Sequence, residues 1–262
     1  MKSKIIAFAG AAVVVVLVYF GMSNKPPKVS AFDEQREKLI DSLQYPNGDA
    51  LIQMHKDMTR ASGGSKSALL NQLSEEWLKL GQPSISADYL RQLADNDPTY
   101  TNYMTAGAAL SSLIDFEQSD NLRVNLVYGA RYCYETAEKL QPGDLDARIG
   151  LGAVLVSGGN TPMEGIMMLR EIDAENPGNV KVNLELGRFS VMSGQFDKAL
   201  ERFEAVLQKD SLNLQARYMI AQTYLGLKDT AEAIGALEKL KSMTTDPTLV
   251  GQVETEINNL NQ

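Results

Sequence analysis

Apolar residues recur along the chain in groups whose spacing repeats every 34 residues. In the stretch from Leu184 to Phe203, Leu186 stands beside the small Gly187, and Ala199 and Phe203 follow four residues apart. Counted from residue 180, these four residues occupy places 7, 8, 20 and 24. Windows that start at residues 67, 146 and 214 hold matching residues at most of these places: Leu73, Ser74 and Leu90; Gly152, Ala153, Gly165 and Leu169; and Ile220, Ala221, Ala233 and Leu237. Each window therefore predicts two helices joined by a turn.

This spacing resembles the tetratricopeptide repeat, a 34-residue helix-turn-helix whose pattern is W-x2-L-G-x2-Y, then A-x3-F, then P. Small residues at places 8 and 20 let the two helices approach each other, and large residues at places 7, 11 and 24 fill the space around that contact. Glycine at place 15 ends the first helix, and proline near place 32 ends the second. The resemblance implies an all-α, TPR-like helical-hairpin solenoid over residues 67–245, with turns near residues 81, 160, 194 and 228.

The window that starts at Thr101 departs from this spacing. Pro142 suits place 32 and Ala130 suits place 20, yet about ten extra residues intervene. The insertion lies around residues 115–125. Two interpretations stay open: both helices are longer there, or the turn is a loop.

Two flanking segments accompany the array. Residues 246–262 begin with Asp-Pro, which is typical of a helix start, and Leu249, Val253, Ile257 and Leu260 form one apolar stripe, so we expect a C-terminal capping helix. Residues 23–66 hold a linker and two predicted N-terminal helices, at 30–43 and 49–60, the second of which ends at a flexible Ser62–Ser65 stretch. These helices are expected to form a divergent hairpin; the alternative is a stalk.

Residues 5–22 carry no charge, and as a helix they would extend roughly 27 Å, which is close to the hydrocarbon thickness of a bilayer. They predict a transmembrane anchor that follows a short N-terminal tip at residues 1–4. A cleaved signal peptide and a buried soluble helix are the alternatives. We therefore expect a single-pass membrane protein of a membrane-anchored bacterial TPR type. In a bacterial host the repeat array would lie on the periplasmic, extracytoplasmic side.

The chain beyond residue 28 is acidic, with 21 basic residues against 33 acidic ones. An anionic surface repels phosphate backbones and anionic headgroups, so nucleic acid is not expected as a partner. We expect a protein or peptide partner instead. The sequence does not predict an oligomeric state.

Candidate catalytic and metal-binding residues are few. His55 is the only histidine and has no metal-ligand spacing around it, so we expect it on the surface. Cys133 lies in a predicted second helix and is expected to pack there. Without a P-loop, a dinucleotide fingerprint or a nucleophile elbow, the sequence predicts no enzyme, no cofactor and no metal site. An enzyme would need a site that these patterns do not reveal.

The resemblance also implies a binding groove, because places 2, 5, 9 and 12 of tetratricopeptide repeats usually face the concave side. Carried over, the peptide-binding candidates are Leu184, Arg188, Val191, Tyr218, Gln222 and Leu225. Arg188 is expected to be free to meet a carboxylate. Some of these residues could instead contact the neighbouring repeat. A two-carboxylate clamp is not expected, since Glu75 would repel such a ligand.

The predicted function is a non-catalytic scaffold or client-holding factor, anchored in the membrane, that binds a peptide or partner helix in the groove. The alternative is a structural subunit of a membrane complex, of the secretion translocon or cytochrome c maturation type, which uses its convex face or the 115–125 insertion.

Overall fold

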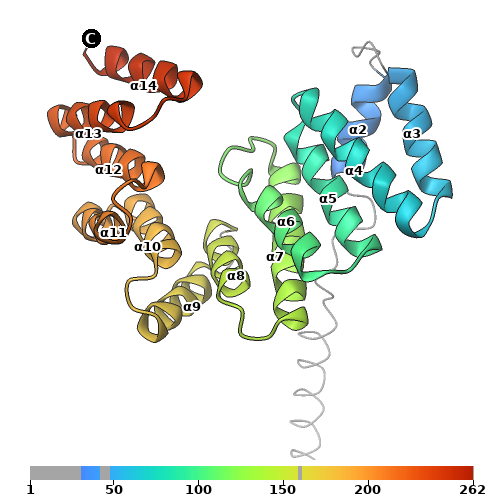
Figure 1. Ribbon diagram of the computed structural model, residues 1–262, viewed down its shortest axis with the longest axis horizontal. Helices are drawn as coiled ribbons and strands as arrows, with labels where there is room; N and C mark the ends of the chain where they lie inside the picture. Colours follow the sequence, from blue (N-terminus) through green and yellow to red (C-terminus); the bar gives the residue numbers. More distant parts are fainter. Residues whose placement is uncertain (1–30, 42–47, 159–160, 262) are drawn as a thin grey trace, which may run out of the picture. The chain divides into compact units, whose positions relative to one another are not determined.

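The computed structural model describes residues 31–41, 48–158 and 161–261, and within these ranges every regular element is a helix. The chain divides into two compact units, Met1–Leu140 and Gln141–Gln262. The predicted array, residues 67–245, extends over both units. Figure 1 shows the helices of each unit.

Unit 1 contains six described helices: α2 (Ala31–Asp41), α3 (Gly48–Arg60), α4 (Gly63–Lys79), α5 (Pro83–Asn96), α6 (Tyr100–Ser111) and α7 (Asp120–Leu140). Helices α4 and α5 pack as one hairpin and α6 and α7 as the next, while α3 packs on α4. Helix α2 packs on the two second helices, α5 and α7, which also contact each other. The core of the first hairpin holds Trp77 and Tyr89, both fully buried.

Unit 2 contains seven helices: α8 (Leu145–Ser157), α9 (Pro162–Glu175), α10 (Val180–Met192), α11 (Phe196–Lys209), α12 (Leu214–Gly226), α13 (Thr230–Ser242) and α14 (Pro247–Leu260). Three hairpins follow one another, α8 with α9, α10 with α11 and α12 with α13, and α14 packs on α13. Figure 1 shows α8, α10 and α12 on one side of this unit and α9, α11 and α13 on the other. Asp144, Asn179 and Asn213 each cap the start of a first helix by accepting a backbone N–H.

The turns lie where the sequence predicts them. Gly81 and Gly194 adopt positive φ values of 71° and 72° between the helices of their hairpins, which glycine does at little cost. Lys228 adopts a φ of 62° at the equivalent turn of the last hairpin. Helix α8 ends at Ser157 and α9 begins at Pro162. The prediction of TPR-like hairpins is confirmed.

Small residues sit where the paired helices touch. A Cβ atom on Gly165 would meet the carbonyl oxygen of Gly152 and the side chain of Val156. A Cβ atom on Gly187 would lie 2.5 Å from the Phe203 ring. Only glycine therefore permits these two helix pairs to approach as closely as they do.

The insertion in unit 1 takes the form of a loop and one longer helix, whereas the alternative in which both helices are longer is wrong, because α6 has only 12 residues. After α6 the chain makes a turn and a short loop from residue 112 to 119, and α7 is then 21 residues long. The Ser62–Ser65 stretch is not a flexible linker, because α4 already begins at Gly63. The glycines there open a helix of 17 residues.

The predicted membrane location is contradicted. Across residues 31–41, 48–158 and 161–261, no helix combines the length and apolar character that crossing a bilayer requires. The predicted anchor, residues 5–22, and the tip before it lie outside the described residues.

Candidate functional site

The first helices of unit 2 form a continuous surface, since α10 contacts both α8 and α12. The residues that recur every 34 positions on it define what we call the first-helix face: Val154, Ser157, Arg188, Val191, Tyr218, Gln222, Leu225 and Glu256. Five of the six predicted peptide-binding residues are in this set. The sixth, Leu184, lies beneath it.

Leu184 and Val191 contribute to packing. Leu184 is 9% exposed and belongs to a cluster with Ala199, Phe203, Val206 and Ala216, and Val191 packs against the same cluster. Both side chains therefore join α10 to its neighbours, as the alternative interpretation of the groove residues foresaw.

Arg188 is not free, contrary to expectation. Its Nε and Nη2 atoms donate hydrogen bonds to Glu185 Oε2 at 3.2 and 3.0 Å, and Nη2 also donates to Ser157 Oγ at 3.1 Å. The guanidinium carbon lies 4.4 Å from the centre of the Phe189 ring. A charge with these partners links α8 to α10, and a ligand would have to displace Glu185 to pair with it.

Tyr218, Gln222 and Leu225 present the part of the face on α12. Gln222 Nε2 donates a hydrogen bond of 2.7 Å to Glu256 Oε1, and this bond links α12 to α14. Tyr218 remains 39% exposed, and Leu225 is half-buried. Burial, and then the nearby Glu256 carboxylate, raise the pKa of Tyr218, so its phenol stays protonated and can donate a hydrogen bond at neutral pH.

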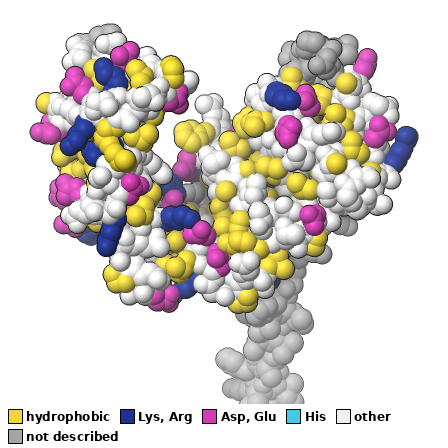
Figure 2. Space-filling model, in the orientation of Figure 1, with side chains coloured by type: hydrophobic (Ala, Val, Ile, Leu, Met, Phe, Trp, Pro, Cys, Tyr) yellow, Lys and Arg dark blue, Asp and Glu magenta, His cyan; other side chains and the backbone are white. Residues whose placement is uncertain are grey.

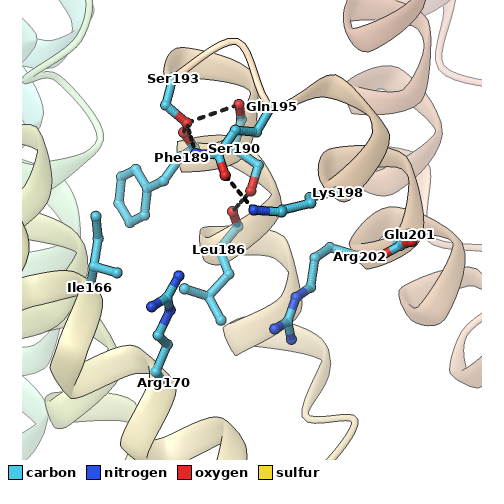
Figure 3. A pocket seen from close by; sticks show the side chains of 10 residues that line it. All are labelled: Ile166, Arg170, Leu186, Phe189, Ser190, Ser193, Gln195, Lys198, Glu201 and Arg202. Carbon is cyan, nitrogen blue, oxygen red and sulfur yellow. Dashed lines mark hydrogen bonds between the residues drawn. The ribbon is translucent and has the colours of Figure 1, made fainter.

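A pocket of about 200 Å³ opens between α9, α10 and α11 of unit 2. Figure 3 shows Arg170 and Arg202 on either side of Leu186, with Lys198 above them, and this set of three cations defines what we call the basic pocket. Arg202 Nη1 donates to Asp173 Oδ2 at 2.6 Å, and Lys198 Nζ donates to Gln195 Oε1 at 2.7 Å. The sequence analysis missed this pocket, because its cations come from two successive repeats, Arg170 from one and Lys198 and Arg202 from the next.

His55 in unit 1 is half-buried, so it is less exposed than a freely solvated surface histidine. Its Nδ1 lies 3.0 Å from Tyr89 Oη, and Arg36, itself 8% exposed, lies over the same Tyr89 ring at 5.8 Å and forms an ion pair with Asp33. Burial, and then the Arg36 charge, lower the pKa of His55. These contacts join α2 and α3 to the first hairpin.

Cys133 is fully buried in α7, as predicted, and burial raises the pKa of its thiol to about 12. A thiol with so high a pKa is a poor nucleophile at neutral pH. Across the part of the chain that the structure describes, no group of three or more His, Cys, Asp and Glu side chains is placed to hold a metal ion.

Comparison with protein families matches residues 190–254, from the end of α10 into α14, to the tetratricopeptide repeat family. No curated protein matches the chain. The match supports the resemblance that the 34-residue windows indicate. It also covers the α12 part of the first-helix face.

The chain is also similar to solved structures of TPR proteins. A thermophilic TPR protein of Thermus thermophilus is 16% identical to this chain, covers 72% of it with 97% of its own length, and has a TM-score of 0.55. YrrB, described as a TPR protein with an unusual peptide-binding site, is 19% identical, with 71% and 91% covered and a TM-score of 0.41. MamA of Desulfovibrio magneticus is 20% identical, with 70% and 97% covered and a TM-score of 0.43. The Thermus structure shows that the fold is an all-α, TPR-like solenoid.

Proposed function

We propose that this protein is a non-catalytic binding module whose repeat array holds a peptide segment or a helix of a partner protein on the first-helix face of unit 2. The observation that carries the proposal is the exposure of Tyr218. It keeps 39% of its surface accessible on a face built from three successive first helices. Exposed tyrosines of this kind supply much of the binding energy in many protein interfaces, because a large rigid ring loses little conformational entropy on binding.

Polar cross-links prepare this face for a ligand. The hydrogen bonds from Arg188 to Ser157 and from Gln222 to Glu256 fix neighbouring first helices on both sides of Tyr218. A face held in this way needs little rearrangement when a partner binds, which lowers the cost of association.

The predicted residues then divide into two roles. Tyr218 and Leu225 would contact the ligand, and Gln222 would offer its remaining polar atoms to a peptide backbone. Leu184, Val191 and Arg188 would support the face from beneath and from the side. An apolar or aromatic residue of the partner is therefore the expected anchor.

Binding of fluorescent peptides cut from a candidate partner tests the proposal, with the full chain as receptor. Tyr218→Ala combined with Leu225→Ala should weaken binding at least roughly thirtyfold, which corresponds to a loss of about 2 kcal/mol at a single hot spot. Tyr128→Ala is the matched control, because Tyr128 in unit 1 is 37% exposed. Its loss should leave the affinity unchanged. If the double variant binds as tightly as the wild type while its helicity is intact, the first-helix face is not the site.

A second candidate function is a structural subunit that contacts its neighbours through the insertion of unit 1. Phe116, in the loop before α7, is 82% exposed, more than any other exposed large hydrophobic residue of the described part. A photo-crosslinking amino acid placed at residue 116, and separately at residue 218, distinguishes the two functions. Crosslinks from 218 favour the binding module, and crosslinks from 116 favour the structural subunit.

A further inference from the structure

The basic pocket has a counterpart one repeat further along unit 2. A second pocket, of about 330 Å³, lies between α11, α12 and α13. Six residues of the basic pocket stand 34 positions before six residues of this second pocket: Arg170, Leu186, Ser190, Lys198, Glu201 and Arg202 before Glu204, Ile220, Tyr224, Glu232, Gly235 and Ala236. The repeat therefore builds the same concavity twice, on the side of unit 2 where second helices succeed one another.

The two pockets carry opposite charges at equivalent positions. Arg170 in the first corresponds to Glu204 in the second, and Lys198 corresponds to Glu232. Arg202 corresponds to the uncharged Ala236. The second pocket has two cations of its own, Arg217 and Lys239, so its charges balance, whereas the basic pocket has three cations and one carboxylate. Because six lining positions are equivalent, the charge difference at Arg170 and Lys198 is one feature that separates the ligands the two pockets would accept.

The three cations of the basic pocket differ in their partners. Arg202 is held by Asp173 and by Asn183 Oδ1, at 2.6 and 2.9 Å. Lys198 donates to the amide oxygen of Gln195. Within the residues that the structure describes, neither Lys198 nor Arg170 forms an ion pair. The pocket has one carboxylate of its own, Glu201.

The pocket combines this charge with an apolar wall. Ile166, Leu186 and Phe189 line it from α9 and α10, and Figure 3 shows Ile166 and Leu186 on either side of Arg170. A cavity of about 150 Å³ is large enough for a benzene molecule. At about 200 Å³ the basic pocket can therefore receive a side chain of moderate size.

The surrounding protein is otherwise acidic. Residues 141–262 carry 11 basic and 17 acidic side chains, and Figure 2 shows the two kinds interspersed over the visible face of the molecule. Long-range attraction thus does not draw anions to unit 2, and selectivity for an anion has to come from close contacts within the pocket.

We propose that the basic pocket is a second binding site, which takes an acidic peptide segment of a partner protein. One carboxylate lies between Arg170 and Lys198, and a neighbouring apolar side chain of the peptide packs on Leu186 and Phe189. This site is independent of the first-helix face, and it can exist whether or not Tyr218 binds a ligand.

The test uses the full chain and a short fluorescent peptide of alternating Glu and Leu with an amidated C-terminus. Arg170→Glu with Lys198→Glu gives the basic pocket the carboxylates that its counterpart has at these two positions, and the peptide should bind about tenfold more weakly or worse, since repulsion replaces two charge-assisted contacts. The milder pair Arg170→Gln with Lys198→Gln covers the case in which charge reversal disturbs folding. Glu204→Gln with Glu232→Gln in the second pocket is the matched control and should leave binding unchanged.

Four results would overturn the proposal. The first is a wild-type protein that does not bind the peptide, or binds a Gln-Leu version as well. The second is unchanged binding by both variants of Arg170 and Lys198. The third is loss of this binding in the Tyr218→Ala, Leu225→Ala variant, which would place the peptide on the first-helix face. Displacement of the peptide by inorganic phosphate at equal concentration would show a simple anion site and would equally contradict a peptide site.

Discussion

The two units use the same hairpins but join them through different helices. In unit 1 the second helices α5 and α7 contact each other, and α2 packs across both. In unit 2 the first helices contact each other, and within the described residues the segment that reaches their face is α14, through Glu256. The 34-residue pattern thus determines how two helices pair within a hairpin. It does not determine which helices approach between hairpins, or whether another segment covers them.

The length of α7 accounts for part of this difference. It has 21 residues, whereas the second helices α5, α9, α11 and α13 have 13 or 14. Its first two turns bury Leu122 and Leu126, so the added length of α7 is packed within unit 1. An extended second helix gives α2 a second element to pack against.

Two buried side chains of α2, Phe32 and Arg36, hold this helix against its neighbours in unit 1. Phe32 is 2% exposed, and the guanidinium of Arg36 is buried against the Tyr89 ring beside Asp33. On the first-helix face of unit 2, by contrast, Tyr218 keeps more than a third of its surface accessible among the described residues. We infer that a ligand of unit 2 would cover the first-helix face in the way that α2 covers α5 and α7 in unit 1.

The largest change in the free energy of unfolding is expected for a substitution at the contact between the two helices of a hairpin. Gly187→Ala in unit 2 would place a Cβ 2.5 Å from the buried Phe203 ring, whereas the nearest atom to a Cβ at Gly107 in unit 1 is 3.1 Å away. We expect Gly187→Ala to lower the free energy of unfolding by about 2 kcal/mol, because overpacking exceeds the gain in helix propensity of about 1 kcal/mol. For Gly107→Ala the two effects should nearly cancel.

Urea unfolding followed by circular dichroism measures both changes, with amide hydrogen exchange in α10 and α11 to locate the first. Gly235→Ala is the control, since a Cβ there meets nothing within 4 Å and α13 should gain stability. Equal effects at residues 187 and 107 would mean that the hairpins of the two units are equally tight.

The anchor of α2 is the next target. Arg36→Ala removes the cation that lies over Tyr89, and we expect a loss of about 1–2 kcal/mol in the free energy of unfolding of unit 1. The loss stays below that of a fully buried pair because the Asp33 side chain is 36% exposed and can be solvated again. Trp77 is the only tryptophan of the chain and lies in the core of unit 1, so its fluorescence reports this unit.

Arg60→Ala, at the exposed end of α3, is the matched control and should leave the Trp77 transition in place. Hydrogen exchange in α2 should rise in Arg36→Ala. If α2 keeps its protection, Phe32 alone holds the helix, and the buried cation is not required for the covering that distinguishes unit 1.

The sequence predicts the hairpins well because their determinants are local and periodic. Gly81 and Gly194 mark the turns, and Val253 and Ile257 place the stripe of α14. The position of α2 could not be predicted, because it depends on Tyr89, more than fifty residues away from Arg36.

The candidate site was predicted less completely. Tyr218 lies at the surface where the resemblance places it, but Arg188 is occupied by Glu185, three residues before it. That pairing is a local helix contact and could have been read from the spacing. The basic pocket could not be predicted, because it forms where two successive repeats pack, and neither Arg170 nor Lys198 is unusual in its own helix.

The smallest change in the free energy of unfolding is expected for substitutions in the turns of the two units. Lys228 adopts a φ of 62° where Gly81 of unit 1 adopts 71°, and a side chain in this region costs roughly 1 kcal/mol. Lys228→Gly should therefore raise the free energy of unfolding of unit 2 by about 0.5–1 kcal/mol, whereas Gly81→Ala should lower that of unit 1 by a similar amount. Thermal unfolding of both variants measures the opposite shifts. A loss of stability in Lys228→Gly would show that the Lys228 side chain makes a favourable contact that outweighs the cost of its backbone conformation.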